Sequence, residues 1–488
     1  MLYRQKFDTF IRVYDGPEGR DVGYITNQSS FSDQVTDKSG AVFLKALSRQ
    51  PCEFGEMVAE IAGAYKDAGH AVVEKDAAEF YALLEKDGFI VSGETPEELD
   101  RKDKRFSYSE LMPKTMREDF TPKEFRADSD TQDYLADHFK NNPHLTQFQV
   151  ELTSRCNERC VHCYIPHENK ISDIDPALFY DTLDQLRGMG VLSLTLSGGE
   201  PLLHPRFAEF LQKAKDYDFS INVLSNLTLL SDEIIAEMKA NRLSSVQVSL
   251  YGMEPEIHDS ITKLPGSFYK TRDAILRLIE NDIPLQISCP VMKQNKNSYV
   301  AVAKWAEEHR VRAVTDYIMM ARYDHTTSNL NNRLTLDEAG DIIRDIIKMD
   351  GDYEERLREA DFTQVEQRDM SDDALCGVCI SSICMVANGN IYPCAGWQDY
   401  VVGNIAQTPL AEIWKHSPKV QYLRSLRKRD LPKCMICVDR HFCAMCMVRN
   451  ANEDPAGDPL KINEHFCKVA ALNRKIALDW KAALRAAK

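Results

Sequence analysis

The chain has 488 residues, a formal net charge of −15, 43% hydrophobic residues and 28% charged residues. This composition predicts a soluble protein of two to four domains, and no apolar run is long enough to indicate a membrane span. The acidic charge argues against a general nucleic-acid surface. The first residues lack the apolar core of a signal peptide, so the fourteen cysteines point to metal clusters in a reducing cytoplasm and not to disulfides.

The first 98 residues predict a small winged-helix domain. Alternating strands are expected at residues 10–14 and 22–26, followed by helices at 39–47, 54–65 and 75–84 and a last strand at 87–91. Between Lys45 and Asp87 there are five Lys and Arg against nine Asp and Glu. A phosphate-binding surface requires the opposite balance, so peptide binding is favoured over DNA binding. A purely structural cap is the third reading of this segment.

The middle of the chain alternates strands with helices. Residues 99–145 are charged and predict a linker with one short helix at 130–139. Strands are then expected at 148–152, 192–196, 220–224, 245–250, 285–290 and 313–319, and helices at 178–186, 207–214, 233–238, 269–278 and 299–308. Six repeats of strand and helix over residues 146–325 predict a parallel sheet with its helices outside. The carboxyl ends of such strands carry the chemistry of α/β folds.

A loop with three cysteines follows the first of these strands. Cys156, Cys160 and Cys163 have the spacing Cys-x3-Cys-x2-Cys and no obvious fourth partner nearby. A closed structural zinc site needs four ligands. Three thiolates instead suit a 4Fe–4S cluster with one iron left open for a small molecule.

A glycine-rich turn follows the second strand and completes a known pattern. Its residues are Gly198, Gly199, Glu200 and Pro201. Together with the cysteine loop, this turn resembles the radical S-adenosylmethionine (SAM) enzymes, although His162 stands where that family often has an aromatic residue. The resemblance implies a partial (β/α)6 TIM-like barrel. It also implies that the three cysteines hold the cluster, that the turn grips the amino group of SAM, and that the reduced cluster cleaves SAM to a 5′-deoxyadenosyl radical.

Further SAM contacts are implied at the ends of later strands. Ser225 and Asn226 lie where the family binds the ribose, and Ser249 matches a serine that contacts the cofactor sugar or carboxylate. Lys263 replaces a usual glycine. Strand-end serines and asparagines are also common caps and turn formers, and that reading stays open. No catalytic acid or base is identified.

The last third of the chain contains nine cysteines. After a helical bridge at 326–375, they are Cys376, Cys379, Cys384, Cys394, Cys434, Cys437, Cys443, Cys446 and Cys467. Asn388-Gly389 predicts a hairpin between two of them. The pattern resembles the SPASM domain, with x2 in place of x3 before Cys446, over residues 376–467. The resemblance implies one auxiliary 4Fe–4S cluster on Cys434, Cys437, Cys443 and Cys467. It implies another on Cys394, Cys446 and two of Cys376, Cys379 and Cys384. A zinc site is the alternative, and residues 468–488 predict a C-terminal helix.

The winged-helix order resembles the PqqD-like domain that recognises the leader segment of ribosomally made precursor peptides. The combined resemblance implies an α/β enzyme that abstracts a hydrogen atom from such a precursor and installs a thioether or carbon–carbon crosslink. It implies a flavodoxin or ferredoxin as electron donor, and neither nucleic acid nor membrane as partner. The alternatives are another SPASM-type enzyme, such as one that forms formylglycine, and an iron–sulfur DNA-binding regulator. Ala395 stands where the formylglycine-forming enzymes commonly have an aspartate.

Overall fold

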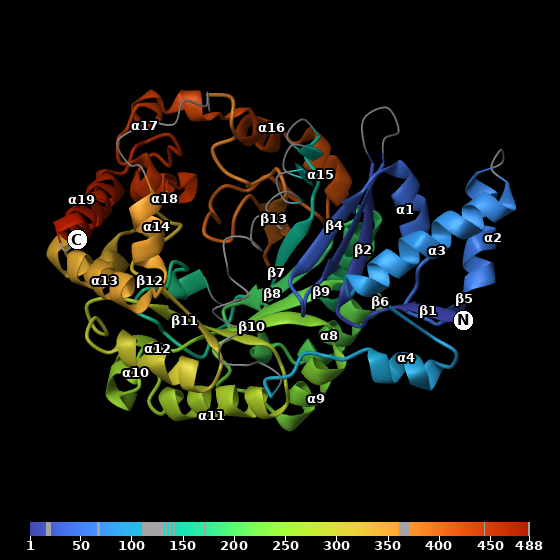
Figure 1. The fold of residues 1–488 in the computed structure, drawn as a ribbon. Coiled ribbons are helices and arrows are strands. Elements are labelled where there is room, and N and C mark those ends of the chain that lie inside the picture. Colours follow the sequence, from blue (N-terminus) through green and yellow to red (C-terminus); the bar gives the residue numbers. More distant parts are fainter. Residues whose placement is uncertain are drawn as a thin grey trace.

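The computed structural model describes residues 1–15, 21–65, 69–109, 131, 134–135, 138–139, 142–169, 172–360, 371–443 and 445–486. An N-terminal region, a central barrel and a C-terminal region follow one another along the chain. Figure 1 shows the N-terminal region at the right of the barrel and the C-terminal region running across the top of the view to its left edge. No helix in the described residues has the length and apolar character needed to cross a membrane.

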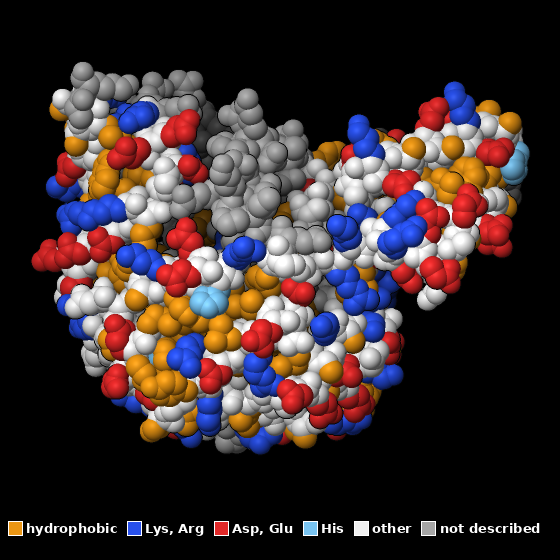
Figure 2. All heavy atoms as spheres, turned by 60° about the horizontal axis from the view of Figure 1, so that its bottom comes forward, with side chains coloured by type: hydrophobic (Ala, Val, Ile, Leu, Met, Phe, Trp, Pro, Cys, Tyr) orange, Lys and Arg blue, Asp and Glu red, His pale blue; other side chains and the backbone are white. Residues whose placement is uncertain are grey.

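The N-terminal region combines two small sheets with four helices. Its elements are β1 (Leu2–Gln5), β2 (Thr9–Tyr14), β3 (Val22–Asn27), β4 (Ser32–Thr36), α1 (Lys38–Lys45), β5 (Cys52–Glu53), α2 (Phe54–Ala64), α3 (His70–Lys86), β6 (Ile90–Gly93) and α4 (Pro96–Lys102). The antiparallel sheets have the orders β2-β3-β4 and β5-β1-β6. Asp and Glu side chains gather on the outer end of this region, where it projects from the barrel (Figure 2).

The strands and helices expected in this region are all present, with additions. β1, β4, β5 and α4 were not expected, and α4 crosses the expected boundary at residue 98. β1 pairs with β5 and β6 and not with β2. Most of the linker, including half of the residues of its expected helix, lies outside the described residues.

The central barrel is a row of parallel strands with helices on its outer face. Its strands are β7 (Gln147–Thr153), β8 (Ser193–Gly198), β9 (Ser220–Leu224), β10 (Leu243–Ser249), β11 (Leu285–Pro290) and β12 (Arg312–Asp316). Its helices are α7 (Pro176–Gly188), α8 (Phe207–Asp216), α9 (Asp232–Ala240), α10 (Pro255–Thr262), α11 (Ser267–Glu280) and α12 (Tyr299–Glu308), with short turns η2 (His167–Asn169) and η3 (Pro201–Leu203). Each strand and helix expected here is present within a few residues, so the prediction of a parallel α/β sheet is confirmed.

The alternation along the strands separates two faces of the sheet. Phe148, Val150 and Leu152 of β7 are almost fully buried and belong to the large core that the helices share. Successive side chains of a strand point to opposite faces. The intervening positions Gln149, Asn222 and Gln286 are only partly buried, so the inner, concave face of the sheet is polar.

The barrel sheet continues into the cysteine-rich C-terminal region. The order β12-β11-β10-β9-β8-β7-β13-β14-β15 makes one sheet of nine strands. β13 (Ser382–Met385) is parallel to β7, with Cys384 opposite Gln149, and the hairpin partner β14 (Asn390–Tyr392) and β15 (Gly403–Asn404) follow. The predicted hairpin is present, with Gly389 at φ +82° in its turn.

The remaining helices form the bridge and the C-terminal region. They are η4 (Ser328–Asn332), α13 (Leu336–Met349), α14 (Tyr353–Glu359), α15 (Leu410–His416), α16 (Pro418–Ser425), η5 (Lys428–Asp430), α17 (Pro432–Met435), η6 (Arg440–Phe442), α18 (Met447–Glu453) and α19 (Glu464–Ala486). The amphipathic helix α19 packs on α13 through a small cluster of buried apolar residues: Ile343, Ile347 and Ile476. The C-terminal helix expected from residue 468 therefore begins earlier, at Glu464.

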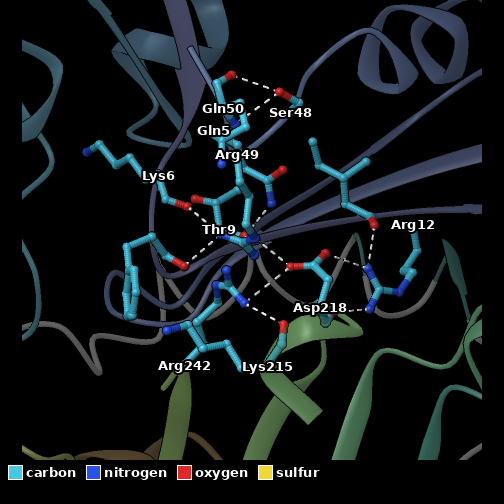
Figure 3. A network of polar contacts seen from close by, with 12 residues as sticks. Gln5, Lys6, Thr9, Arg12, Ser48, Arg49, Gln50, Lys215, Asp218 and Arg242 are labelled. Carbon is cyan, nitrogen blue, oxygen red and sulfur yellow. Dashed lines mark hydrogen bonds and ion pairs between the residues drawn. The ribbon is translucent and has the colours of Figure 1, made fainter. Parts of the chain in front are cut away.

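One carboxylate joins the N-terminal region to the base of the barrel (Figure 3). Asp218, in the turn before β9, accepts from Arg49 Nε at 2.5 Å and from an Arg12 terminal nitrogen at 3.3 Å. Arg242, before β10, lies 3.8 Å from the same carboxylate. Arg49 also donates to the carbonyl of Thr9, and Arg12 to that of Val191. These contacts lie at the amino ends of the barrel strands, opposite the cysteine loop.

Candidate active site

The cysteine loop leaves the carboxyl end of β7 and is held by backbone contacts. Val161 N donates to Ile261 O at 3.0 Å, which ties the loop to α10. Cys156, Cys160 and Cys163 are each partly buried. The pKa of Cys160 is raised well above its usual value by burial, by Glu158, and by the neighbouring Cys163 and Cys156. The ionised form of a thiol with such neighbours is stabilised by a nearby cation, and the iron ions of an iron–sulfur cluster would supply it.

The glycines of the strand-end turn let β8 close against this loop. Gly198 has a φ of +146°, and a Cβ there would lie 2.2 Å from the Thr153 carbonyl oxygen. A Cβ on Gly199 would lie 2.2 Å from the Arg155 carbonyl oxygen. Gly199 N donates to Thr153 O and Glu200 N to Arg155 O, each at 2.8 Å. Side chains at these two positions would therefore separate the turn from the cysteine loop.

Glu200 is fully buried at the centre of the strand ends. Its carboxylate accepts from Leu202 N at 3.0 Å, from Ser225 Oγ at 2.7 Å and from Asn226 N at 2.7 Å. Burial raises the pKa of Glu200 to about 7, against the lowering effect of these hydrogen bonds. A carboxylate has about four acceptor positions, so one remains for an ammonium group. An ammonium there would favour the ionised form.

Ser225 and Asn226 form part of the same network. Asn226 Nδ2 donates to Asn157 Oδ1 at 2.9 Å, and Asn157 Nδ2 donates to Thr228 Oγ1 at 2.7 Å. Ser225 Oγ accepts from Leu227 N at 2.9 Å. The network connects the end of β9 to the cysteine loop through Asn157. Pro201 is the first residue of the turn η3, and its side chain is buried.

Tyr251 is a site residue that the sequence reasoning missed. It follows the end of β10, is 3% exposed, and its hydroxyl lies 2.9 Å from His162 Nε2. Burial raises the pKa of Tyr251 well above its usual value, with the nearby Cys160 and Glu158 also raising it and a hydrogen bond with Ser249 lowering it. Its side chain also neighbours Cys160 and Ser249, so the cysteine loop and the end of β10 meet at this phenol. The feature of the sequence that could have pointed to Tyr251 is an aromatic residue two positions after Ser249, the serine at the end of the strand.

The segment after Tyr251 is built by local hydrogen bonds. Asp259 accepts from Gly266 N at 2.6 Å and from Phe268 N at 2.9 Å, which fixes the start of α11. His258 is 1% exposed, and burial lowers its pKa to about 4, so it is neutral at pH 7. Lys263 ends α10 with a φ of +59°, the conformation that a glycine adopts without strain.

The nine C-terminal cysteines gather into two groups of electrostatic neighbours. Burial, Cys467, Cys434 and Cys437 raise the pKa of Cys443 to about 11. The second group consists of Cys376, Cys379, Cys384, Cys394 and Cys446. Each of these thiols is an electrostatic neighbour of at least one other member. The assignment of these groups to two auxiliary clusters stays a prediction.

Within the group of five, three thiols differ in their hydrogen bonds. The nearby backbone N–H groups of Gly377 and Val378 lower the pKa of Cys376, and those of Ala395 and Gly396 lower the pKa of Cys394, against the larger raising effect of burial. Cys384 Sγ instead donates to the Tyr392 carbonyl at 3.5 Å. In the described residues, no three His, Cys, Asp or Glu side chains converge on a single metal ion. A 4Fe–4S cluster takes one thiolate per iron, so its ligands need not converge on one point.

Two further residues near the strand ends of the barrel, Cys289 and Tyr317, have structural roles. Cys289 is 1% exposed in the core, and burial raises its pKa to about 12. Tyr317 bonds Asn473 of α19 through its hydroxyl, with Asn473 Nδ2 donating at 2.9 Å. Both residues therefore serve packing.

Comparisons with known proteins agree with this site. Residues 150–306 match the Radical SAM superfamily, and residues 357–438 match SPASM, an iron-sulfur cluster-binding domain. An AdoMet-dependent heme synthase of Methanosarcina barkeri (strain Fusaro / DSM 804) is 26% identical over 333 residues, 63% of this chain and 92% of the relative. The antilisterial bacteriocin subtilosin biosynthesis protein AlbA of Bacillus subtilis (strain 168) is 26% identical over 315 residues, 62% of this chain and 67% of AlbA.

The fold is also similar to solved structures along most of the chain. The crystal structure of Streptococcus suis SuiB bound to precursor peptide SuiA has a TM-score of 0.60 at 14% identity, and covers 95% of this chain and 99% of SuiB. SuiB bound to S-adenosylmethionine has a TM-score of 0.59 at 16% identity over the same shares of the two chains.

The thiol groups, the strand-end turn and the parallel sheet define an iron–sulfur enzyme of the α/β class. With the family matches, the chain is an enzyme that contains a Radical SAM domain and a SPASM domain. Its cofactors are 4Fe–4S clusters and S-adenosylmethionine.

Proposed function

We propose that this enzyme matures a ribosomally synthesised precursor peptide by installing a thioether or carbon–carbon crosslink. The observation that carries the proposal is the N-terminal region, fixed to the barrel through Asp218. The match to the heme synthase covers 92% of that relative but only 63% of this chain. This chain therefore has a large part that the match to the heme synthase does not include. SuiB, which was crystallised with a precursor peptide, is similar over 95% of this chain.

The edge of β4 is suited to hold an extended leader segment. β4 pairs only with β3 among the described strands, so its other edge can add a strand by main-chain hydrogen bonds. Gln34 of β4 donates to Asp87 at 2.6 Å, so this edge lies beside the end of α3. The wing-like sheet and α3 of residues 1–98 then form the PqqD-like recognition domain.

The remaining domain boundaries follow the same proposal. Residues 99–145 connect to a radical SAM barrel at 146–325, and residues 326–375 bridge to a SPASM domain at 376–467, with a C-terminal helix at 468–488. The concave face, with Gln149, Asn222 and Gln286, offers amide groups that can hydrogen-bond a peptide backbone. A cytoplasmic location and an electron donor of the flavodoxin or ferredoxin class belong to the same proposal.

The site residues divide the work as follows. Cys156, Cys160 and Cys163 would hold the cluster that, with SAM, supplies the radical for hydrogen abstraction. Glu200 would accept the SAM ammonium, with Gly198, Gly199 and Pro201 shaping the turn, and Ser225, Asn226 and Ser249 would orient the rest of SAM. One auxiliary cluster takes Cys434, Cys437, Cys443 and Cys467. The other takes Cys376, Cys379, Cys394 and Cys446, leaving Cys384, whose sulfur donates to a carbonyl, as the spare thiol.

The experiment uses anaerobically reconstituted holoenzyme and a short peptide encoded beside its gene. Mass spectrometry should show the loss of two hydrogens and a crosslinked fragment. The Cys156→Ala/Cys160→Ala/Cys163→Ala variant should give no product, and its iron content should fall from about twelve to about eight. An unchanged peptide, together with conversion of an iron porphyrin, would favour a tetrapyrrole substrate, as the heme synthase relative suggests.

A further inference from the structure

The surface around Cys434, Cys437, Cys443 and Cys467 is basic, although the chain as a whole has a net charge of −15. Residues 427–441 contain five Lys and Arg against two Asp and Glu, and residues 461–475 contain four against one. These two segments meet, because Arg474 Nε lies 4.0 Å from Asp439 Oδ1. We call them together the basic surface. Figure 1 shows α17 and α19, which carry it, at the edge of the molecule away from the N-terminal region.

Aliphatic side chains are exposed at the centre of the basic surface. Ile436 is 78% exposed and Val438 is 54% exposed, on either side of Cys437. Ile436 is the most exposed large hydrophobic side chain in the part of the chain that the structure describes. Cys467 is exposed as well. This auxiliary thiol group therefore reaches the surface through an apolar patch, while Cys379 and Cys384 of the other group are buried.

The positive charge of the basic surface is only partly neutralised. Lys433, Lys461 and Lys468 are exposed and form no ion pair with any residue that the structure describes. Two of these lysines directly precede or follow a cysteine of the group. An apolar centre with a charged rim is the common layout of a protein interface, and the rim charge steers a partner of opposite sign.

We propose that the basic surface is the docking site of a small acidic one-electron carrier protein, which exchanges electrons with the auxiliary cluster on Cys434, Cys437, Cys443 and Cys467. The inference rests on that cluster assignment in the proposed function. The exchange moves one electron from the reduced carrier to the cluster, and no bond forms or breaks. An anionic membrane is the competing occupant. It is less suited because the exposed aliphatic side chains are few and sit between the cluster cysteines.

The test measures how fast reduced flavodoxin bleaches the clusters of the holoenzyme in an anaerobic stopped-flow instrument. Lys433→Glu/Lys468→Glu should slow this reduction about tenfold at low salt and weaken the binding of oxidised flavodoxin, because steering falls with charge reversal. Lys75→Glu, on an exposed lysine of α3, is the matched control and should leave the rate unchanged. High salt should bring wild type and variant together.

Several results would overturn the proposal. One is a rate of reduction by flavodoxin that is unchanged in the double variant, and another is an equal fall of that rate in Lys75→Glu. A third is that the wild type sediments with phosphatidylglycerol vesicles while the double variant does not. If the double variant loses iron, Lys461→Glu, which adjoins no cysteine, replaces it and carries the same expectation. Dithionite needs no docking, so dithionite-driven peptide crosslinking should survive in either variant. Its absence in wild type would refute the proposed function and leave the docking result standing.

Discussion

Replacement of Asp218 by Asn should loosen the N-terminal region from the barrel. Asn keeps the size of the side chain and tolerates the positive φ of +60° at this position, so the change removes mainly the charge. The side chains of Arg12, Arg49 and Arg242 are 3%, 18% and 11% exposed, and that of Asp218 is 23% exposed. Removing one partner of a buried pair costs about 3–5 kcal/mol, and the partial exposure of Asp218 favours the lower end, about 3 kcal/mol.

Hydrogen–deuterium exchange measures this loss locally. A cost of about 3 kcal/mol corresponds to about a hundredfold faster exchange at amides protected by the contact. The faster exchange should be confined to peptides covering residues 5–14 and the turn before β9, because Arg12 and Arg49 hold these segments. The control is Asp232→Asn, which removes a fully exposed partner of Arg277 and should change nothing measurable. Exchange within twofold of wild type in Asp218→Asn would refute the reasoning.

Three further changes test the site. Lys263→Gly should raise the free energy of unfolding by about 1 kcal/mol in calorimetry, because it relieves a left-handed residue, while Lys270→Gly within α11 should lower it. In the apoprotein, Glu200 has a raised pKa, so its contribution to stability is present below about pH 4.5 and is lost as the pH rises through about 7. As the pH rises from about 4.5 to about 7, the thermal midpoint of Glu200→Gln should therefore fall less than that of the wild type. Parallel curves of midpoint against pH for the two proteins would contradict this. Tyr251→Phe should lower the reduction potential of the cluster on Cys160 by roughly 40 mV, the equivalent of one hydrogen bond of about 1 kcal/mol, in an EPR titration. An unchanged potential would show that the phenol does not bond the thiolate.

The sequence predicted the barrel well because its strands are buried and its helices amphipathic, so both leave local patterns. Residues 220–224, 285–290 and 299–308 were predicted with the bounds that the structure has. The edge strand β4, with the sequence SDQVT, has no such pattern because all five side chains are only partly buried. The pairing of β13 with β7 was also not predicted, since nothing local encodes a contact between segments so far apart.

At the site, the sequence identified residue types better than their contacts. The two auxiliary cysteine groups were implied by the resemblance to the SPASM domain, and spacing alone did not divide the nine cysteines between them. Glu200 was expected to serve a ligand, but three of its acceptor positions are used within the chain. Tyr251 reaches His162 and Cys160 only through the closure of the barrel, and neither propensity nor spacing contains that distance.

The shared nine-stranded sheet also sets an order of events during synthesis. β7 gains its second neighbour only when residues 382–385 have been made, and 235 residues separate the bonded pair Thr146 and Ser381 at the start of this pairing. Until then a central strand presents an open edge that can pair with other chains. A nascent barrel is therefore most exposed to aggregation while the last third of the chain is still on the ribosome. Chaperone protection is therefore needed until residues 382–385 have joined the sheet.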